Sequence, residues 1–339
     1  MKTNKTIRNI IALLLAAAMM LAFAACGAAP APAAAEAPAD DEGTIKVAII
    51  KQLDHASLDE IANAVAARFD EINASGEAKI EYEISSGQND QTILKQLCDQ
   101  AIADNVDVIV PIATTAAQVA ALSAEGTGIK VVYAAISDPA AANLTGIDYV
   151  TGTSDALNTS FILDMMLAQN PEIKKVGLLY SLSEPNSATP IADAKAYLEA
   201  KGIEYVEQTA NTNDEVVAAA SALIAADVDA VFTPTDNIIM AAELAIYEDF
   251  AKAGIPHYTG ADSFVRNGAF ATCGVNYTEL GRKTAELAMK SFAGEELDDY
   301  YLMDGGIITV NTETADILGA DYSVFADMGE LIEVTTSKD

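Results

Sequence analysis

The sequence predicts an α/β protein with two doubly wound lobes, each a parallel sheet covered by helices, joined by a hinge of several strands. Short β-branched runs alternate with longer helical stretches from Thr44 onward. This alternation occurs in two successive sets, and residues 144–152 (LTGIDYVTG) interrupt it between them. Strand–helix alternation is typical of parallel sheets with helices on both faces. Two such sets therefore predict two sheets.

The first set begins at the first β-branched run after Thr44. Its predicted elements are, in order, strand 45–50, helix 57–74, strand 78–84, helix 90–104, strand 106–110, helix 115–125 and strand 129–135. Ser57 and Glu60 have the spacing of a capping box at a helix start. Gly76 stands where a helix end needs a left-handed residue.

The second set repeats the pattern. Its predicted elements are helix 154–169, strand 175–180, helix 188–201, strand 203–208, helix 213–226, strand 228–233, helix 237–252 and strand 255–260. Thr212 and Glu215 form a second predicted capping box, and Gly202 and Gly254 fit helix ends. A further helix over 278–293 is predicted to return to the first lobe.

These crossings give the predicted domain limits. The first lobe comprises 44–150 plus about 275–305, and the second comprises 151–274 plus about 306–339. Three crossings between similar lobes predict a hinge.

The N-terminal residues predict export. Residues 1–26 have a positive start, an apolar run and small residues before Cys26, as a secretory signal does. The residues LAFAACG resemble the bacterial lipobox, which implies lipid on Cys26 and an anchor on the outer face of the cytoplasmic membrane. Residues 27–43 are rich in Ala and Pro and are predicted to be a disordered tether.

Composition excludes several classes of function. The formal net charge of −31 argues against nucleic-acid binding, which needs clustered Lys and Arg. Cys98 and Cys273 are far apart and in no metal-binding pattern, so buried free thiols are favoured over a disulfide. No phosphate-binding loop, nucleophile elbow, H-E-x-x-H or C-x-x-C motif occurs, so the sequence predicts no enzyme and no cofactor. Of the two histidines, His257 is read as a core residue and His55 is a pocket candidate.

Polar loops follow the predicted strands. In an open parallel sheet, ligands bind outside the carboxyl ends of the strands. The loops there are 52–57, 85–90, 113–115 and 137–139 in the first lobe, and 181–189, 210–214, 234–237 and 261–263 in the second. Two lobes that face each other with such loops would form a cleft for a small polar molecule.

An ordered set of segments resembles one family. The segments are QNDQT (88–92), IATTAAQ (112–118), AAISDP (134–139), NLTG (143–146), KVGLLYSLSEPNS (175–187), FTPTDN (232–237), GADS (260–263) and NYTELGRKTAELA (276–288). Together they resemble the ABC-transporter substrate-binding lipoproteins of the tryptophan/phenylalanine/tyrosine type. The resemblance implies a type I periplasmic-binding-protein fold and an aromatic amino acid, or a similar molecule, as ligand.

A zwitterionic amino acid needs donors for its carboxylate and an acid for its ammonium group. The carboxylate candidates lie at helix starts, where backbone N–H groups and the helix dipole add to side-chain donors: Thr114, Thr115, Asn186 and Ser187. Asp236 and Asp262 are the ammonium candidates. The alternative for Asp236 is an ordinary helix cap. Further ligand candidates are Gln88, Asp138 and Asn237, although Asp138 and Asp90 are equally suited to capping or turns.

The aromatic ring of such a ligand would stack on Tyr or Phe, because the chain has no Trp. Tyr133, Tyr180 and Phe264 are candidates, and a core position is the alternative for each. The predicted function is capture of an amino acid between the lobes and delivery to an ABC permease powered by an ATPase. The alternative is a sugar, nucleoside or other small polar ligand, for uptake or sensing.

Overall fold

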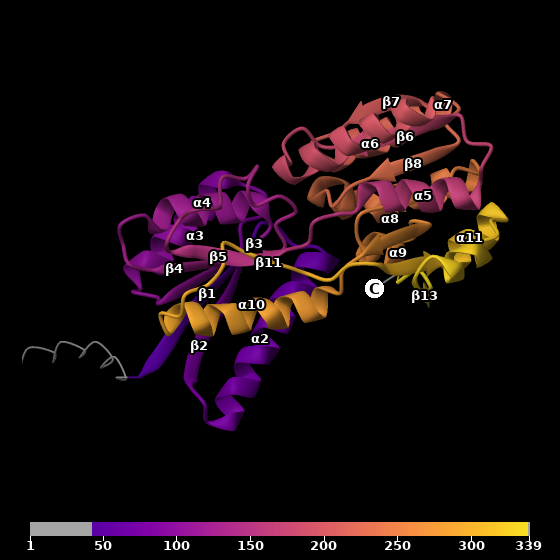
Figure 1. Ribbon diagram of the computed structural model, residues 1–339. Helices are drawn as coiled ribbons and strands as arrows, with labels where there is room; N and C mark the ends of the chain where they lie inside the picture. Colours follow the sequence, from indigo (N-terminus) through magenta and orange to yellow (C-terminus); the bar gives the residue numbers. More distant parts are fainter. Residues whose placement is uncertain (1–42, 338–339) are drawn as a thin grey trace, which may run out of the picture. The chain divides into compact units, whose positions relative to one another are not determined.

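A computed structural model describes residues 43–337, so the predicted signal peptide, Cys26 and nearly all of the tether lie outside the described residues. Two sheets organise these residues, as the sequence predicts (Figure 1). No helix within 43–337 combines the length and the apolar character needed to cross a membrane.

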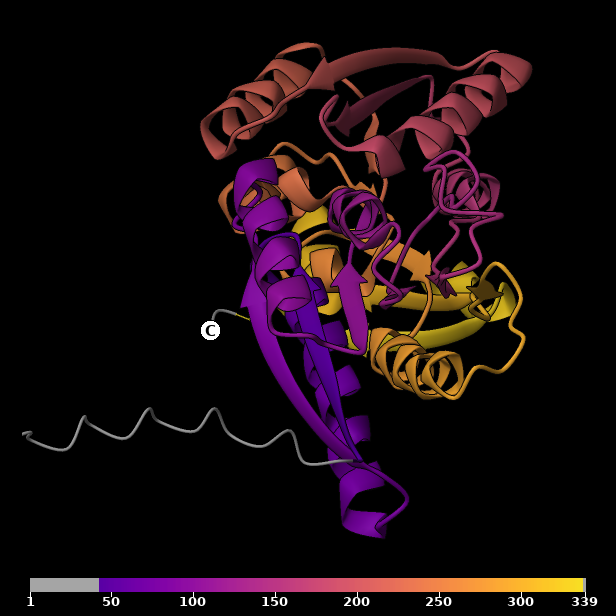
Figure 2. The ribbon, with the colours of Figure 1, turned by 90° about the vertical axis from the view of Figure 1, so that its left-hand side faces the viewer.

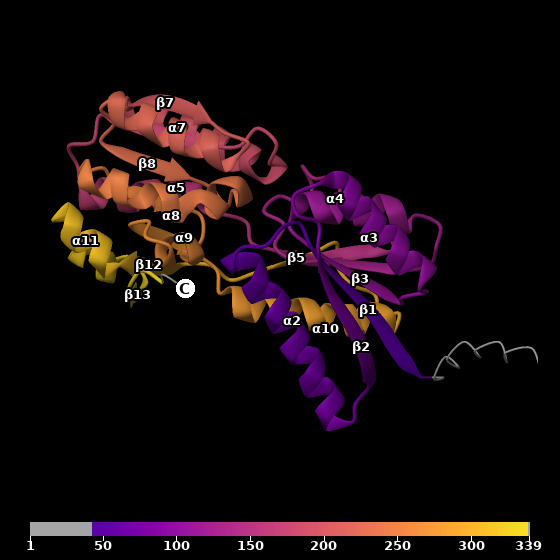
Figure 3. The ribbon, with the colours of Figure 1, turned by 180° about the vertical axis from the view of Figure 1, so that it is seen from behind.

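The first lobe is built on six parallel strands in the order β11-β5-β4-β3-β1-β2. Its elements are β1 (Thr44–Lys51), α2 (Ala56–Ser75), β2 (Lys79–Ser86), α3 (Gln91–Ala103), β3 (Val108–Ile112), α4 (Thr114–Ala124), β4 (Lys130–Tyr133), β5 (Val150–Ser154), α10 (Tyr277–Phe292) and β11 (Tyr301–Leu302). Val47 and Ile49 of β1 join the core on the side of α2 and α10, whereas Ile50 packs with α3 and α4. The sheet is therefore covered on both faces, as Figure 3 shows from behind.

The second lobe has seven strands in the order β13-β12-β10-β9-β8-β6-β7, all parallel except the β10–β12 pair. Its elements are α5 (Thr159–Gln169), β6 (Lys175–Tyr180), η1 (Pro185–Ser187), α6 (Ala188–Lys201), β7 (Glu204–Thr209), α7 (Asn213–Ala225), β8 (Ala230–Thr233), α8 (Asn237–Lys252), β9 (His257–Thr259), α9 (Asp262–Arg266), β10 (Ala271–Gly274), β12 (Ile307–Asn311), α11 (Thr312–Leu318), η2 (Ser323–Asp327) and β13 (Glu330–Val334). Helices α7 and α8 share one core with Val231, and α5 and α6 share the other with Phe232.

The chain passes between the sheets three times, after β5, after β10 and after β11. Helix α10 thereby lies with the first lobe, beside α2, although β10, the strand before it in the sequence, belongs to the second (Figure 2). Gly281 permits this contact, because a Cβ there would lie 2.6 Å from the carbonyl oxygen of Ile61. Three connections of this kind form a hinge.

The position of strand β5 contradicts two predictions from the sequence, a lobe boundary and the start of a helix. The lobe boundary predicted between 150 and 151 is wrong, because Val150–Ser154 form a strand of the first sheet between β4 and β11, and the chain crosses after Ser154. The helix predicted from 154 begins at Thr159, with Asn158 as its cap. The strand was missed because its residues, VTGTS, are small and polar, although all five are buried. Gly152 is needed there, since a Cβ would lie 2.2 Å from the carbonyl oxygen of Tyr133.

Most of the predicted helix ends are confirmed. Thr212 accepts a hydrogen bond from the Glu215 N–H, and Gly76, Gly202 and Gly254 all have positive φ angles. Ser57 is the exception, because α2 begins one residue earlier and the Ser57 hydroxyl bonds Ser263 in the other lobe. Cys98 and Cys273 are free and buried, as expected.

Candidate functional site

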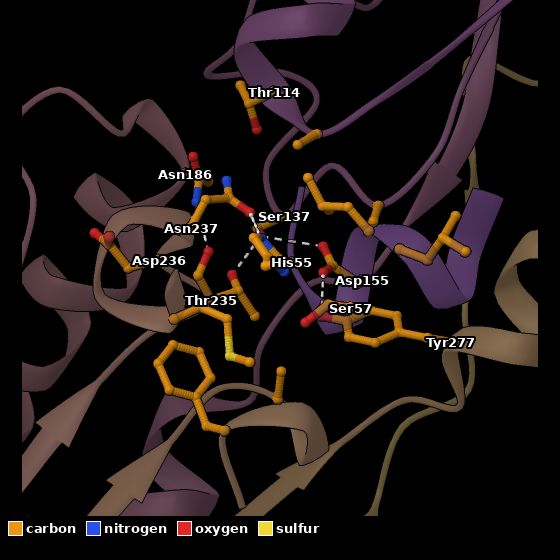
Figure 4. A pocket seen from close by; sticks show the side chains of 17 residues that line it. His55, Ser57, Thr114, Ser137, Asp155, Asn186, Thr235, Asp236, Asn237 and Tyr277 are labelled. Atoms are coloured by element: carbon orange, nitrogen blue, oxygen red, sulfur yellow. Dashed lines mark hydrogen bonds between the residues drawn. The ribbon is translucent and has the colours of Figure 1, made fainter. Parts of the chain in front are cut away.

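Loops at the carboxyl ends of both sheets enclose a cavity between the lobes (Figure 4). The first lobe contributes His55, Ser57, Leu58, Ile61, Ala113, Thr114, Ala135, Ser137, Asp155 and Tyr277, and the second contributes Asn186, Thr235, Asp236, Asn237, Met240, Ala261 and Phe264. The space left among these side chains is about 20 Å³, roughly the room of one water molecule. An amino acid can enter this site only if the lobes separate.

Hydrogen bonds hold the lobes together around the cavity. The Gln52 amide donates to Glu184 at 2.7 Å, His55 bonds Asn237 at 3.0 Å, and Ser137 bonds Thr235 at 3.0 Å. Further bonds join Ser57 to Ser263 and Thr189 to Asp138. All of these bonds must break when the lobes separate, so the structure represents a closed arrangement.

Asp155 is the acid of the cavity that sequence reasoning missed. Its carboxylate accepts hydrogen bonds from the Ser137 hydroxyl and the Tyr277 hydroxyl, both at 3.1 Å. Burial raises the pKa of Asp155, and these two bonds oppose the rise. None of the residues lining the cavity, all within 43–337, is Lys or Arg. A carboxylate has lone pairs for further donors, so Asp155 can receive a cationic group.

Asp236 lines the same cavity, but its carboxylate already has four donors. One oxygen accepts from the backbone N–H groups of Ile238 and Ile239, which makes Asp236 the N-cap of α8. The other oxygen accepts from the Ser181 N–H and the Ser187 hydroxyl, each at 2.7 Å. The structure therefore gives Asp236 the capping role that the sequence left as its alternative.

Three buried polar atoms of the cavity residues have no hydrogen-bond partner within residues 43–337. They are Nδ1 of His55, Oγ1 of Thr114 and Oδ1 of Asn186. Buried polar atoms are nearly always paired in folded proteins, because an unpaired one costs about 1–3 kcal/mol. Thr114 is also the first residue of α4, where the helix dipole favours a negative group. These atoms are suited to contacts with a polar ligand.

Two alanines of the cavity hold left-handed backbone conformations. Ala113 after β3 has a φ of 78°, and Ala135 after β4 has a φ of 57°. Non-glycine residues persist in this region only where the surrounding structure enforces it, and such strain gathers at functional sites. Both positions therefore support a binding role for this edge of the first sheet.

Glu184 is a second buried acid beside the cavity. Burial, and then the nearby Asp236 carboxylate, raise the pKa of Glu184 to about 7, although Asn237 and Gln52 donate to it. The Gln52 side chain also accepts from the Thr115 N–H, so it links Glu184 to the start of α4. Neither Gln52 nor Glu184 was a predicted site residue.

Glu184→Gln is expected to change how stability varies with pH. The pKa of Glu184 in the folded protein, about 7, lies above the ordinary 4.5, so the folded protein keeps a proton that the unfolded chain releases. The stabilisation from Glu184 is therefore complete below pH 4.5 and is lost as the pH rises through about 7. The limiting slope is about 1.4 kcal/mol per pH unit.

Urea denaturation of both proteins at several pH values would check this. The free energy of unfolding of the variant minus that of the wild type should rise over this pH range. The variant must be compared with the wild type because His55 also makes stability depend on pH. Burial lowers the pKa of His55, so its contribution to the free energy of unfolding rises with pH in both proteins and cancels in the difference. A difference that does not vary with pH would contradict the assignment.

The structure brings some of the predicted residues together and separates others. Thr114, Asn186, Asp236 and Asn237 line the cavity, and Ser187 lies behind Asp236 as its hydrogen-bond donor. The remaining four predicted residues do not line it: Thr115, Gln88, Asp138 and Asp262.

Each of these four side chains lies elsewhere. Thr115 is buried at the start of α4, and Gln88 is exposed in a turn. Asp138 accepts from the Ala141 N–H and the Thr189 hydroxyl, and Asp262 pairs with Arg266 at 3.1 Å. Asp236 and Asp262 thus do not converge on one point in the cavity.

Among the predicted aromatic partners, only Phe264 lines the cavity. The hydroxyl of Tyr133 bonds the Asp299 carbonyl, and that of Tyr180 bonds Glu207. Tyr277 was missed as a cavity residue. Its segment NYTELG contributed to the family resemblance and preceded a predicted helix, but nothing in it indicates that the hydroxyl reaches Asp155.

Comparison with known proteins decides the family. Residues 46–323 match the family described as ABC transporter substrate binding protein. The chain belongs to this family. Members of the family are solute-binding proteins that serve ABC transporters outside the cytoplasm. The match confirms the family resemblance predicted from the sequence.

Relatives extend the comparison over most of the chain. A tyrosine-binding protein of Clostridioides difficile is 27% identical over 297 residues, which are 86% of this chain and 84% of that protein. A Streptococcus pneumonia ABC domain in complex with L-Trp is 26% identical with a TM-score of 0.78, covering 85% of this chain and all of that one.

The ligand-free, open structure of a Clostridium difficile substrate-binding protein gives a lower TM-score, 0.64, at 27% identity, covering 86% of this chain and 100% of that one. The lower score against an open form agrees with the closed arrangement of the lobes seen here.

Proposed function

We propose that this ABC transporter substrate binding protein captures an aromatic amino acid in the cavity between its lobes and delivers it to a permease. The observation that carries the proposal is Asp155, a buried carboxylate in a cavity without Lys or Arg. An ammonium group would neutralise it. A sugar or nucleoside, the alternative ligands, has no such group.

The other end of an amino acid would meet the start of α4. The Thr114 hydroxyl can donate to a carboxylate there, where the helix dipole adds a favourable field. Leu58, Ile61, Met240 and Phe264 give the cavity an apolar part for a side chain. The relatives that bind tyrosine and L-Trp support an aromatic one.

Closure is a population shift, and no bond is made or broken. A ligand that contacts both lobes only in the closed arrangement favours that arrangement by its difference in affinity. Lipid on Cys26 would hold the protein at the outer face of the cytoplasmic membrane, close to the permease.

Titration with L-tryptophan is expected to report binding directly. The chain has no Trp, so excitation at the red edge of indole absorption reports the ligand almost alone. Transfer of the indole into the apolar part of the cavity should shift its emission to the blue. Thermal shifts with L-tyrosine and L-phenylalanine, and with sugars and nucleosides as controls, extend the test. No emission change, together with no thermal shift from any aromatic amino acid, would refute the proposal.

A further inference from the structure

A chain of hydrogen bonds crosses the cavity from Glu184 to His55. The Asn237 Nδ2 donates to the Glu184 carboxylate at 2.6 Å, and the Asn237 Oδ1 lies 3.0 Å from Nε2 of His55. Above about pH 7, where Glu184 is ionised, its carboxylate can only accept, so the amide nitrogen faces it. The amide oxygen is therefore the atom that His55 meets.

This orientation fixes the tautomer of His55. An amide oxygen only accepts, so Nε2 of His55 must carry the hydrogen. Burial lowers the pKa of His55, which favours the neutral ring. Nδ1 then holds a lone pair, and it is buried without a partner within residues 43–337. His55 lines the cavity (Figure 4), so it offers a neutral acceptor there.

The chemistry of the cavity indicates which donor suits that acceptor. An ammonium group gains more from the charged Asp155 than from a neutral imidazole. The Nδ1 lone pair is thus available for a neutral donor on the ligand's side chain. Leu58 and Ile61 follow His55 along α2 and line the same cavity, so a ring packed on them would lie beside His55.

We propose that His55 is a specificity-determining residue that accepts a hydrogen bond from the ring O–H or N–H of an aromatic amino acid, and that Glu184 positions it through Asn237. The proposal rests on the proposed function for the identity of the ligand. The tautomer of His55 does not depend on any ligand, so it can be tested separately.

The chain offers its own control, because it contains only two histidines. His257 is buried in the second lobe, with Nδ1 3.0 Å from the Glu243 carboxylate and Nε2 2.8 Å from the Thr233 hydroxyl. Nδ1 of His257 must therefore carry a hydrogen. In neutral rings the two histidines would be opposite tautomers.

Nitrogen-15 NMR of the histidine-labelled protein above pH 7 tests the tautomer without ligand. We expect His55 to show hydrogen on Nε2 and His257 to show it on Nδ1. Glu184→Met removes the acceptor for the Asn237 amide, so His55 should become a mixture of tautomers while the His257 signals stay unchanged. Glu215→Met, at an exposed acid of the same lobe, is the matched control.

A His55 with hydrogen on Nδ1 in the wild type would overturn the proposal. An unchanged His55 tautomer in Glu184→Met, with His257 signals showing an intact fold, would remove Glu184 as the positioning residue.

Calorimetric titration tests specificity. The wild type should bind L-tyrosine about 10- to 100-fold more tightly than L-phenylalanine, since the latter leaves Nδ1 unpaired. In His55→Leu this ratio should fall close to one. A ratio that the substitution leaves unchanged would overturn the specificity role. If L-tyrosine, L-phenylalanine and L-tryptophan all fail to bind the wild type, the proposed function fails, whereas the NMR result still decides the tautomer.

Discussion

Asp155→Asn is expected to weaken the binding of L-tyrosine and L-tryptophan by about 3 kcal/mol, which is more than a hundredfold. Asparagine keeps the shape of the side chain but carries no charge, so the ammonium group would lose its counter-charge inside a cavity without other acids free to replace it. The four donors to Asp236 leave that carboxylate committed to the fold.

In Asp155→Asn, the free energy of unfolding should not fall, although the affinity for the ligand does. Burial raises the pKa of Asp155, so the charged carboxylate destabilises the fold, and removal of the charge should leave the free energy of unfolding unchanged or raise it. Isothermal titration calorimetry and urea denaturation measure the two quantities. Asp164→Asn, at an exposed acid that accepts from Tyr197, is the control. Undiminished affinity in Asp155→Asn would show that the ammonium group is bound elsewhere.

Asp236→Ala, unlike Asp155→Asn, is expected to lower the free energy of unfolding by a large amount. Truncation would leave buried donors of Ser181, Ser187, Ile238 and Ile239 without their acceptor. A buried donor left without an acceptor costs about 1–3 kcal/mol, so the loss of all four bonds should cost about 3–5 kcal/mol after partial relaxation, which corresponds to a fall in Tm of roughly 10 °C.

Thr212→Ala is the control for this prediction, because it removes an ordinary helix cap. Thr212 is also an N-cap, but it is exposed and accepts only one hydrogen bond. Its loss should cost about 1 kcal/mol. If Asp236→Ala were as stable as the wild type and yet failed to bind ligand, Asp236 would hold the ammonium group, as the sequence first suggested.

Regular elements with strong local signals were predictable. β1 and β6 are apolar runs, α7 has a capping box, and Gly76 and Gly202 mark helix ends. β5 was not predictable in the same way, because VTGTS owes its burial to its neighbours in the sheet rather than to apolar side chains. The strands β12 and β13 were assigned only to a lobe. β12 pairs with β10, which is separated from it by α10 and β11, and β13 pairs with β12 across α11, so neither pairing is visible as a local pattern.

The sequence by itself determined that polar residues follow the strands, and hence at which edge of each sheet a ligand binds. It could not rank Asp236 and Asp262, which both follow a predicted strand in similar polar stretches, and it placed Asp155 inside a predicted helix over 154–169. The tertiary structure decided their roles through the donors around them. Four donors make Asp236 a cap and Arg266 pairs with Asp262, whereas Asp155 lines the cavity with two donors and has lone pairs left for a ligand. The role of a carboxylate depends on such contacts, and Tyr277, which donates to Asp155, is 122 positions away along the chain.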